Sequence, residues 1–575
     1  MRTHRASRAR TRRIDTARRG LLLTAVAAGM AVMPSPAFAL VAPGRVTVPF
    51  MTGQREGVDP FAVAGVAVMP DGRIVTSGIA AGARRLLLTR VLRSGAPDPA
   101  FGGDGIVSLD VPRDPATYGP FPGPPQVAAD GSVYVASAGS ARARSEGQQA
   151  VVTHVLADGT LDPAFGTDGS ATPGVQAGAL ALTGDGRVLL AGHIGRYDIT
   201  NLADASATTT AVVARLTAHG DLDPTFGAGG IAPLPGNDAG VPVALPDGGV
   251  AVTTSQADTS RLVELGPDGS VAPGFDRGAP LVLPGFAEGL LAHPDGSVDV
   301  LSTNRRRTAG ALVRIKRDGA IDASFGGGSV AVSDGALIAG PGGSDLVSAA
   351  ASFEPLPGQP FALTIRRVLA DGSSDPSYGG VSGRVFTAPF GGGYGTIGAI
   401  HAQPTVATLD QTGFRGGAVG VRPGGGLVVA GAAAVIQYTG EGAGIEHEDV
   451  ALAAFGPELA ADPSFGGPAV APSVTFSLPR QRAATAASLR RRYVLVRLAV
   501  STPGLCQISV RARGAVVAKA DVPVFAVLGQ NAHVWLTRSG RRLLPRARRA
   551  AATARATCED LIGSRTTAGA TGMLR

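Results

Sequence analysis

An internal repeat constrains the fold of this chain more than any other feature. A block of fixed length recurs seven times, and in each copy a first position, usually Arg, precedes an aromatic residue by 11 positions. A second position, usually Asp, lies eight residues after the first. The aromatics recur with a mean period of about 61 residues. The copies, as first position, second position and aromatic, are Arg90/Asp98/Phe101, His154/Asp162/Phe165, Arg215/Asp223/Phe226, Glu264/Ala272/Phe275, Arg314/Asp322/Phe325, Arg367/Asp375/Tyr378 and Ala454/Asp462/Phe465.

A tight-turn signal followed by an apolar run lies upstream of each block, as at Asp71-Gly72, Asp130-Gly131 and Asp185-Gly186. Asp-Gly between apolar runs favours a β-hairpin, because both residues tolerate positive φ. Each unit therefore contains about four short strands and no helical stretch. That length and strand number are typical of a propeller blade. We predict an all-β chain: a seven-bladed β-propeller over residues 40–478, followed by a small β-sandwich.

The repeated pattern resembles the delta-60 repeat. In this chain the pattern runs from the Asp-Gly turn through the Arg position to Asp-Pro-x-Phe-Gly, and the resemblance covers roughly residues 44–478. It implies a β-propeller of undefined biochemical role in a secreted setting, and it brings no catalytic residues. The fourth and seventh copies depart most. The fourth lacks the Asp-Pro and Phe-Gly pairs (Ala272-Pro273 and Phe275-Asp276), and the seventh lacks its second Asp-Gly (Glu458-Leu459).

The repeated side chains are predicted to be structural. We expect the aromatic to pack between adjacent blades and the Asp-Pro pair to set a turn. The Arg and Asp positions lie across a hairpin, so they are expected to form an ion pair within the blade. The fourth copy lacks both partners, as such a pair requires. A ring of arginines that binds an anionic ligand in the central channel is the alternative.

Two segments compete to complete the last blade. The segment 44–50 matches the strand that follows each Phe-Gly, and it would close the ring from the N-terminal side. The alternative closure uses residues 473–478. Closure of either kind removes exposed strand edges.

Residues 1–39 read as an export signal. A basic region ends at Arg18-Arg19, an apolar run follows, and Ala37-Phe38-Ala39 is a cleavage site that would leave Leu40 first. The two arginines fit the twin-arginine route, and the general secretion route is the alternative. We expect a secreted or envelope-associated protein without a transmembrane helix in the mature chain, and a monomer.

The C-terminal part differs in charge from the propeller. Residues 479–489 read as a linker and 490–575 as a basic β-sandwich domain. Strands are expected over 493–500, 507–510, 515–520, 533–536 and 551–558, with a short helical turn within 541–550. This part resembles the Arg-rich immunoglobulin-like sandwiches that end many secreted bacterial proteins. Both cysteines of the chain, Cys506 and Cys558, lie here, and an even number in an exported domain favours one disulfide.

Charge indicates the kind of partner. The whole chain carries a formal charge of +8, but residues 479–575 hold 18 basic and three acidic residues, whereas 40–478 is acidic. The basic end has no nucleic-acid motif and few aromatics. We expect it to hold an anionic cell-envelope polymer, while the propeller faces an unknown protein or glycan.

No catalytic, metal-binding or cofactor motif is present, so we predict no catalytic, cofactor or metal residues. The densest acidic cluster, 446–449, is interpreted as a rim loop, with a metal or ligand contact as the alternative. The chain has one tryptophan, Trp535, which argues against Trp-patterned propellers and weakens a sugar-stacking platform.

The leading hypothesis for function is a secreted non-catalytic binding or scaffold protein. The alternative is an extracellular propeller hydrolase or lyase that acts on a polysaccharide or similar polymer; a cluster of three or more Asp, Glu or His at the channel mouth would favour it. Because loops on a rigid scaffold carry binding residues, a ligand is expected at the insertions 111–125, 197–210, 390–416 and 439–449.

Overall fold

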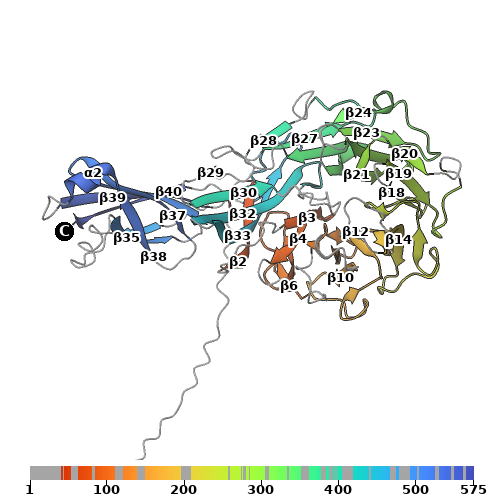
Figure 1. Ribbon diagram of the computed structural model, residues 1–575, viewed down its shortest axis with the longest axis horizontal. Coiled ribbons are helices and arrows are strands. Elements are labelled where there is room, and N and C mark those ends of the chain that lie inside the picture. The colour runs from red at the N-terminus through yellow and green to blue at the C-terminus, as the bar shows by residue number, and fades with distance from the viewer. Residues whose placement is uncertain are drawn as a thin grey trace, which may run out of the picture. The chain divides into compact units, whose positions relative to one another are not determined.

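The described part of the chain forms eight antiparallel β-sheets (Figure 1). The computed structural model describes residues 41–42, 44–52, 63–80, 85–110, 121–138, 149–195, 209–256, 259–273, 275, 280–283, 285–304, 310–332, 336–350, 362–376, 384–387, 393–394, 398–404, 419–439, 442–466, 474–477, 493–500, 504–524, 530–544, 550–560 and 565–574. The predicted export signal, the predicted linker and Tyr378 lie outside these residues.

Sheets 1 to 3 follow one another along the chain. Sheet 1 contains β3 (Val63–Val68), β4 (Ile74–Ala80), β5 (Arg85–Val91) and β6 (Ile106–Leu109). Sheet 2 contains β7 (Phe121–Pro122), β8 (Gln126–Val127), β9 (Val133–Ala138), β10 (Val151–Val155) and β11 (Ser170–Ala171). Sheet 3 contains β12 (Gln176–Leu182), β13 (Val188–Ile194), β14 (Thr210–Leu216) and β15 (Ile231–Pro233).

Sheets 4 to 6 continue the same plan. Sheet 4 contains β16 (Asp238–Ala239), β17 (Val243–Ala244), β18 (Val250–Gln256), β19 (Thr259–Leu265) and β20 (Leu281–Leu283). Sheet 5 contains β21 (Phe286–Ala292), β22 (Val298–Thr303), β23 (Gly310–Ile315) and β24 (Val330–Val332). Sheet 6 contains β25 (Ala336–Ala339), β26 (Asp345–Ala350), β27 (Ala362–Val368) and β28 (Arg384–Thr387); two short 3₁₀ turns span Gly326–Gly328 and Pro341–Gly343.

Sheet 7 joins strands from both ends of the propeller segment. It contains β1 (Val41–Ala42), β2 (Arg45–Thr52), β29 (Gly393–Tyr394), β30 (Gly398–Pro404), β31 (Val419–Val421), β32 (Leu427–Thr439) and β33 (Gly442–Phe455). Strand β2 pairs with β33, with Val46 opposite Leu452. Closure from the N-terminal side is therefore the arrangement that the strands adopt. The competing segment pairs elsewhere: β34 (Val474–Ser477) joins β35 (Tyr493–Val500) of the C-terminal sheet, so the expected boundary at 478 moves to a point before Val474.

The Asp-Gly turns have the predicted geometry. Gly72, Gly131 and Gly186 have φ values of 88°, 86° and 82°. L-residues avoid this region, whereas glycine adopts it readily. The aspartate also holds the turn: the Asp130 Oδ1 accepts a hydrogen bond from the Ser132 amide at 2.9 Å. The turn sequence thus sets the hairpin that begins each sheet.

Neighbouring sheets share hydrophobic cores. Phe101 from the end of the first repeat is fully buried in a cluster that includes Val133 and Val155 of sheet 2. Val46 and Phe465 lie in a cluster with Ile74, which joins sheet 7 to sheet 1. Corresponding clusters, which join sheets 2 and 3, 3 and 4, 4 and 5, and 5 and 6, contain Phe165, Phe226, Phe275 and Phe325.

The succession of contacts closes on itself. A Cβ placed on Gly425, in the turn before β32, would lie 3.4 Å from the Pro341 Cγ in the turn before β26. Strand β25 of sheet 6 also contacts β31 of sheet 7. The fold class is all-β with a propeller plan, as predicted. The described residues of the propeller segment form seven sheets, and the number of seven blades stays a prediction.

The C-terminal strands form one sheet rather than the expected two-sheet sandwich. Its order is β34, β35, β38 (Gln530–Leu536), β37 (Ala515–Val524), β36 (Gly504–Ala512), β39 (Ala550–Asp560) and β40 (Arg565–Leu574). Strand β36 pairs with both β37 and β39, so the hydrogen bonding runs without a break. Helix α2 (Arg538–Leu543) begins after Thr537, whose side chain accepts a hydrogen bond from the Gly540 amide. The immunoglobulin-like sandwich is not confirmed.

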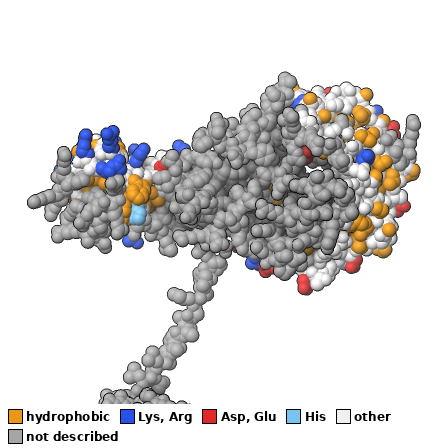
Figure 2. All heavy atoms as spheres, in the orientation of Figure 1, with side chains coloured by type: hydrophobic (Ala, Val, Ile, Leu, Met, Phe, Trp, Pro, Cys, Tyr) orange, Lys and Arg blue, Asp and Glu red, His pale blue; other side chains and the backbone are white. Residues whose placement is uncertain are grey.

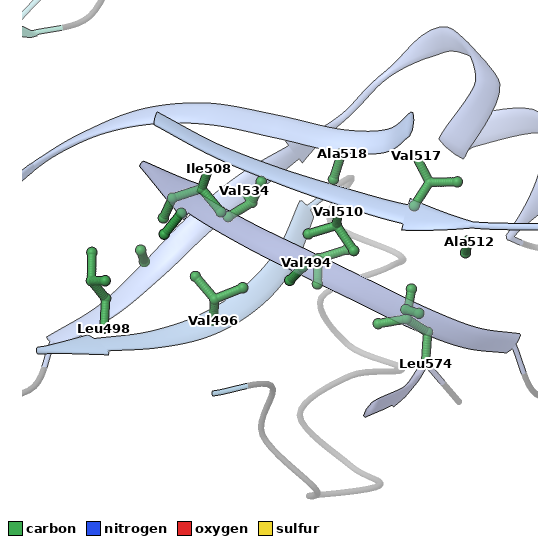
Figure 3. Packing of buried hydrophobic residues seen from close by; sticks show 14 of the residues in the cluster. Val494, Val496, Leu498, Ile508, Val510, Ala512, Val517, Ala518, Val534 and Leu574 are labelled. Carbon is green, nitrogen blue, oxygen red and sulfur yellow. The ribbon is translucent and has the colours of Figure 1, made fainter. Parts of the chain in front are cut away.

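One face of this sheet encloses a single core (Figure 3). Val494, Val496 and Leu498 alternate with more exposed residues along β35, as a strand with one buried face requires. Leu574 on the last strand belongs to the same core. Because residues of β35 and β40 meet in one cluster, the sheet curves onto itself.

The predicted disulfide is present. Cys506 and Cys558 are bonded, and they lie directly opposite each other on β36 and β39. Both are buried within the core of the sheet. Within the described residues, no helix has the length and apolar character needed to cross a membrane.

Replacing both cysteines, Cys506→Ser with Cys558→Ser, is expected to lower the free energy of unfolding of the C-terminal sheet by about 2–4 kcal/mol, because the closed loop of the unfolded chain is released. The only tryptophan, Trp535, lies on β38 of this sheet. Its fluorescence in a urea titration therefore reports this transition. Equal midpoints for the variant and the oxidised wild type would contradict the expectation.

Candidate functional site

The repeated arginine and aspartate lie together within a repeat. The Arg90 Nε lies 2.7 Å from the Asp98 Oδ2, and the Arg215 Nε lies 2.8 Å from the Asp223 Oδ2. The Arg367 Nη1 lies 3.1 Å from the Asp375 Oδ2. The Arg90 side chain is 1% exposed. Buried charges of this kind require a partner.

The same arginines also reach the next sheet. The Arg90 Nη1 donates to the Ala157 carbonyl of the following repeat at 2.6 Å, and the Arg314 Nη1 donates to the Ala370 carbonyl at 2.7 Å. Each guanidinium lies over the aromatic ring of its own repeat, 4.5 Å from the centroid for Phe101 and 4.2 Å for Phe325. One side chain thus joins an aspartate, an aromatic ring and the neighbouring sheet.

A backbone contact accompanies each of these links. The Gly227 amide donates to the Asp268 carbonyl of the next repeat at 2.7 Å. Gly269 follows that carbonyl with φ of 80°, and a Cβ there would lie 2.7 Å from the Gly227 nitrogen. Only glycine at position 269 allows the two backbone segments to approach this closely. The expected alternative, a ring of arginines that binds a ligand, conflicts with the burial of these side chains.

Two copies place a different side chain beside the aspartate. His154 replaces the arginine in the second copy, and its Nδ1 lies 2.9 Å from the Asp162 Oδ2. Burial lowers the pKa of His154, although Asp162 opposes this shift. In the seventh copy Ala454 has no charge, and the Arg422 Nη1 lies 2.6 Å from the Asp462 Oδ2. Arg422 comes from the turn before β32, so a guanidinium from another position fills the same space.

The fourth and fifth copies break the pattern in different ways. In the fourth, Glu264 is buried and burial raises its pKa, while Ala272 offers no charge. In the fifth, Asp322 lies 3.5 Å from the Lys316 Nζ. Arg314 instead contacts Asp299.

Two acidic residues stand where other sheets have apolar core residues. Asp299 follows its turn at the position held by Val75 and Leu189 in sheets 1 and 3. Asp345 holds the position of Ile74 and Val298. Both aspartates are 0% exposed. Among the described residues these substitutions occur in two neighbouring sheets, 5 and 6, and they meet.

The two aspartates share one arginine and one histidine. The Arg314 Nε and Nη2 donate to the two Asp299 oxygens at 2.8 and 2.6 Å. The Arg314 Nη2 lies 3.5 Å from the Asp345 Oδ2. The His293 Nε2 lies 2.7 Å from the Asp299 Oδ2 and 3.8 Å from the Asp345 Oδ1. We call these four residues the 5–6 cluster, and sequence reasoning did not find it.

The environment separates the pKa values of the two carboxyls. Burial and then the neighbouring Asp299 raise the pKa of Asp345 to about 9. Burial also acts on Asp299, but hydrogen bonds from Arg314 and His293 outweigh it and lower the pKa of Asp299 to about 2. Two carboxyls beside one fixed cation retain one proton between them. At neutral pH that proton is on Asp345.

The 5–6 cluster already contains its cation. One ligand atom each from His293, Asp299 and Asp345 lie within 4.8 Å of one another, which is the spacing of a metal site. The Arg314 guanidinium, however, uses both oxygens of Asp299. With both aspartates sealed from solvent, the cluster can store a proton between two sheets but offers no surface to a polymer.

The other predicted site residues lie elsewhere. The segment 446–449, expected as a rim loop, belongs to strand β33. The insertion 390–416 contributes β29 and β30, and β30 pairs with β32, so this insertion is partly an extension of sheet 7. Most of the insertions 111–125 and 197–210 lies outside the described residues.

Removing one member of a buried repeat pair should be far more damaging than removing both. We expect Asp98→Asn to lower the free energy of unfolding by about 3 kcal/mol, because the Arg90 charge stays buried without a counterion. Adding Arg90→Met should recover part of that loss. Urea unfolding of the single and double variants measures the coupling.

The exposed pair Arg317–Asp247 is the control, with side chains 64% and 39% exposed. Its coupling should be under about 1 kcal/mol. Equal coupling energies for the two pairs would show that burial does not matter to the repeat pair.

The 5–6 cluster should make stability depend on pH. The folded protein keeps the Asp345 proton to about pH 9, whereas an unfolded chain loses it near about pH 4. The folded state therefore binds the extra proton between these values, and stability falls as pH rises through that window. Asp345→Asn should match the wild type near the lower limit and exceed it increasingly toward pH 9.

Thermal unfolding followed by circular dichroism at several pH values tests this. Asp299→Asn is the matched control. It should be less stable than the wild type throughout the range near neutral pH, because Arg314 loses the carboxylate that accepts its two short hydrogen bonds. Parallel stability profiles for Asp345→Asn and the wild type would contradict the assignment of the proton.

A family model matches one copy of the repeat. Residues 183–226, from the turn before β13 to Phe226, match "Domain of unknown function (DUF5122) beta-propeller". No curated protein matches the sequence.

Solved structures give only distant similarity. Polysaccharide lyase Uly1 is 10% identical with a TM-score of 0.38, covering 71% of this chain and 92% of that chain. A protein of unknown function from Dyadobacter fermentans is 15% identical with a TM-score of 0.28, covering 72% and 99%. The NanB sialidase from Streptococcus pneumoniae is 9% identical with a TM-score of 0.32, covering 71% and 70%. The fold assignment therefore depends on the strand pairing and on the repeat, whose copy at residues 183–226 is similar to a β-propeller family of unknown function.

Proposed function

We propose that the protein is a secreted, non-catalytic binding or scaffold module of the cell envelope or exterior. The observation that carries this proposal is the use of the repeated polar residues in the framework. Arg90 and Asp98 are 1% and 4% exposed, and each spends its hydrogen bonds on its own repeat or the next sheet. Such residues hold the blades together. Recognition of a ligand is then left to other, exposed residues.

The disulfide supports an oxidising compartment. Cys506 and Cys558 are bonded, and disulfides persist outside the reducing cytoplasm. The export signal at residues 1–39 and the two export routes remain part of this proposal. The basic C-terminal sheet would hold an anionic envelope polymer through charge, and the propeller would face a further protein or glycan.

The alternative, an extracellular hydrolase or lyase, needs acid and base groups that reach a polymer. The 5–6 cluster gathers two carboxyls and an imidazole, but Asp299 and Asp345 are 0% exposed. General acid–base catalysis requires the group to approach the transferred proton to hydrogen-bond distance. The burial of this cluster favours the binding module.

A sedimentation assay with isolated bacterial envelope material tests the proposal. We expect the mature protein, residues 40–575, to bind in a salt-sensitive manner, because the basic end contacts an anionic polymer. Incubation with the same material should release neither new reducing ends nor unsaturated sugars.

A loop variant locates the propeller's contribution. Replacing residues 199–207 with a short Gly-Ser linker leaves β13 and β14 intact and should weaken the salt-resistant part of binding. The Arg317→Gln variant, which changes an exposed side chain, is the control. Release of sugar products by the mature wild-type protein would establish the enzyme and overturn the binding module.

A further inference from the structure

The only tryptophan of the chain lies on an exposed sheet face. Trp535 is 51% exposed on β38, between the buried residues Val534 and Leu536. An exposed indole forfeits much of the stabilisation that burial of such a large side chain provides. The side chains beside Trp535 on the same face indicate whether the exposed ring belongs to a binding surface.

Two further rings lie beside it. Tyr493 on β35 is directly opposite Trp535, and their ring centroids are 5.8 Å apart at an interplanar angle of 77°. The Tyr493 and His533 ring centroids are 4.1 Å apart. Since positions 533 and 535 lie two residues apart on one strand, both side chains point away from the core. We call Tyr493, His533 and Trp535 the aromatic platform.

The platform is bordered by basic residues. Lys519 on β37 is directly opposite Trp535, and it is exposed. Arg497 on β35 is exposed four residues from Tyr493, so it lies on the same face. Asp521 also lies on this face of β37 and is half-buried. In Figure 2, hydrophobic and histidine side chains lie together at the surface of the C-terminal part, with Lys and Arg side chains nearby.

We propose that the aromatic platform binds a strand of an anionic polysaccharide whose sugars carry carboxylates. A pyranose ring presents a face of C–H groups, which packs against the electron-rich face of an aromatic ring. Lys519 and Arg497 supply charge-assisted hydrogen bonds to carboxylates at the edge of the sugar. The exposed face of β35, β38 and β37 suits a polymer that passes across these strands.

Charge complementarity selects this occupant. Residues 479–575 hold 18 basic and three acidic residues, so an acidic polymer is attracted over the whole sheet, while the rings add contacts that charge cannot supply. This inference rests on the proposed function, in which the C-terminal sheet binds an anionic polymer. It identifies the class of polymer and the residues that bind it. The lone tryptophan, which weakened a sugar platform in the sequence, forms one here with Tyr and His.

Trp535 is also the reporter for the test, because no other tryptophan contributes to the emission. The oxidised protein is titrated with three probes: polygalacturonate, which has sugar rings and carboxylates, polyglutamate, which has carboxylates without rings, and dextran, which has rings without charge. Polygalacturonate should change the emission of Trp535 and protect it from acrylamide quenching. Polyglutamate should bind without either effect, and dextran should leave the emission unchanged.

Variants separate stacking from charge. Binding by all variants is measured by co-sedimentation, because the Trp535 variants lack the only tryptophan. Trp535→Ala should weaken polygalacturonate binding by about tenfold, since the loss of one stacked ring costs on the order of 1 kcal/mol. Trp535→Phe should retain most of the affinity, which also shows that the sheet is folded. Met573→Ala is the matched control, because Met573 is 45% exposed on β40 of the same sheet and lies outside the platform.

Each contrary result is distinct. If polygalacturonate and polyglutamate bind equally and Trp535 stays unprotected, the platform is wrong while the charge-based proposal for this sheet survives. If neither polymer binds, both fail. Vesicles of phosphatidylglycerol that shift the emission while polygalacturonate does not would assign the surface to a membrane and overturn the proposal.

Discussion

The buried guanidinium of the repeat is the interaction on which the propeller depends. In sheet 1 it joins Asp98, the ring of Phe101 and a carbonyl of sheet 2 with one side chain. Sheets of a propeller pack face to face through apolar contacts, which lack directional specificity. A charge-assisted hydrogen bond to the next sheet adds direction, and it fixes how one sheet meets its neighbour. In the seventh copy Arg422 supplies the guanidinium where position 454 is Ala. The fourth copy, with Glu264 and Ala272, has no such link within the described residues, and apolar packing joins its sheet to the next one.

The departures from this pattern mark the places with their own chemistry. Sheets 5 and 6 carry Asp299 and Asp345 at positions that are apolar elsewhere, and Arg314 leaves its usual partner to bind them. The interface between these sheets therefore holds a proton and a buried charge. Other interfaces carry different polar links beside the repeat pair, such as the His193 Nδ1 that lies 2.9 Å from the Asp238 Oδ1 between sheets 3 and 4. A repeat protein built from similar units gains one junction that responds to pH.

Sequence reasoning went furthest where local signals are strong. The Asp-Gly turns, the fixed block and the closing strand from residue 44 all follow from short-range patterns, and the structure contains each. Sequence reasoning missed features that depend on contacts between residues far apart in the chain. Arg422 contacts its partner across a hairpin, and Asp345 contacts its partners across a sheet interface. A position-by-position comparison of the repeats would have shown that Asp345 stands at a position that is apolar in other copies. The extension of sheet 7 by β30 and β33, and the pairing of the glycine-containing β40, depend on partners that a single strand does not reveal. The sandwich expectation is not confirmed, since the strands pair in one sheet and alternation predicts a buried face but not the strand order.

Hydrogen exchange on an Arg215→Lys variant tests the central claim most directly, because a lysine keeps the charge but cannot reach Asp223 and the next sheet at once. Arg215 contacts Asp223 of sheet 3 and the Pro267 carbonyl of the following repeat. The account predicts faster exchange at Gly227, whose amide donates to Asp268, and in the turn 266–270 of sheet 4, with binding to envelope material unchanged. Unchanged exchange across that turn, together with lost binding, would contradict it and would make the arginine a recognition residue.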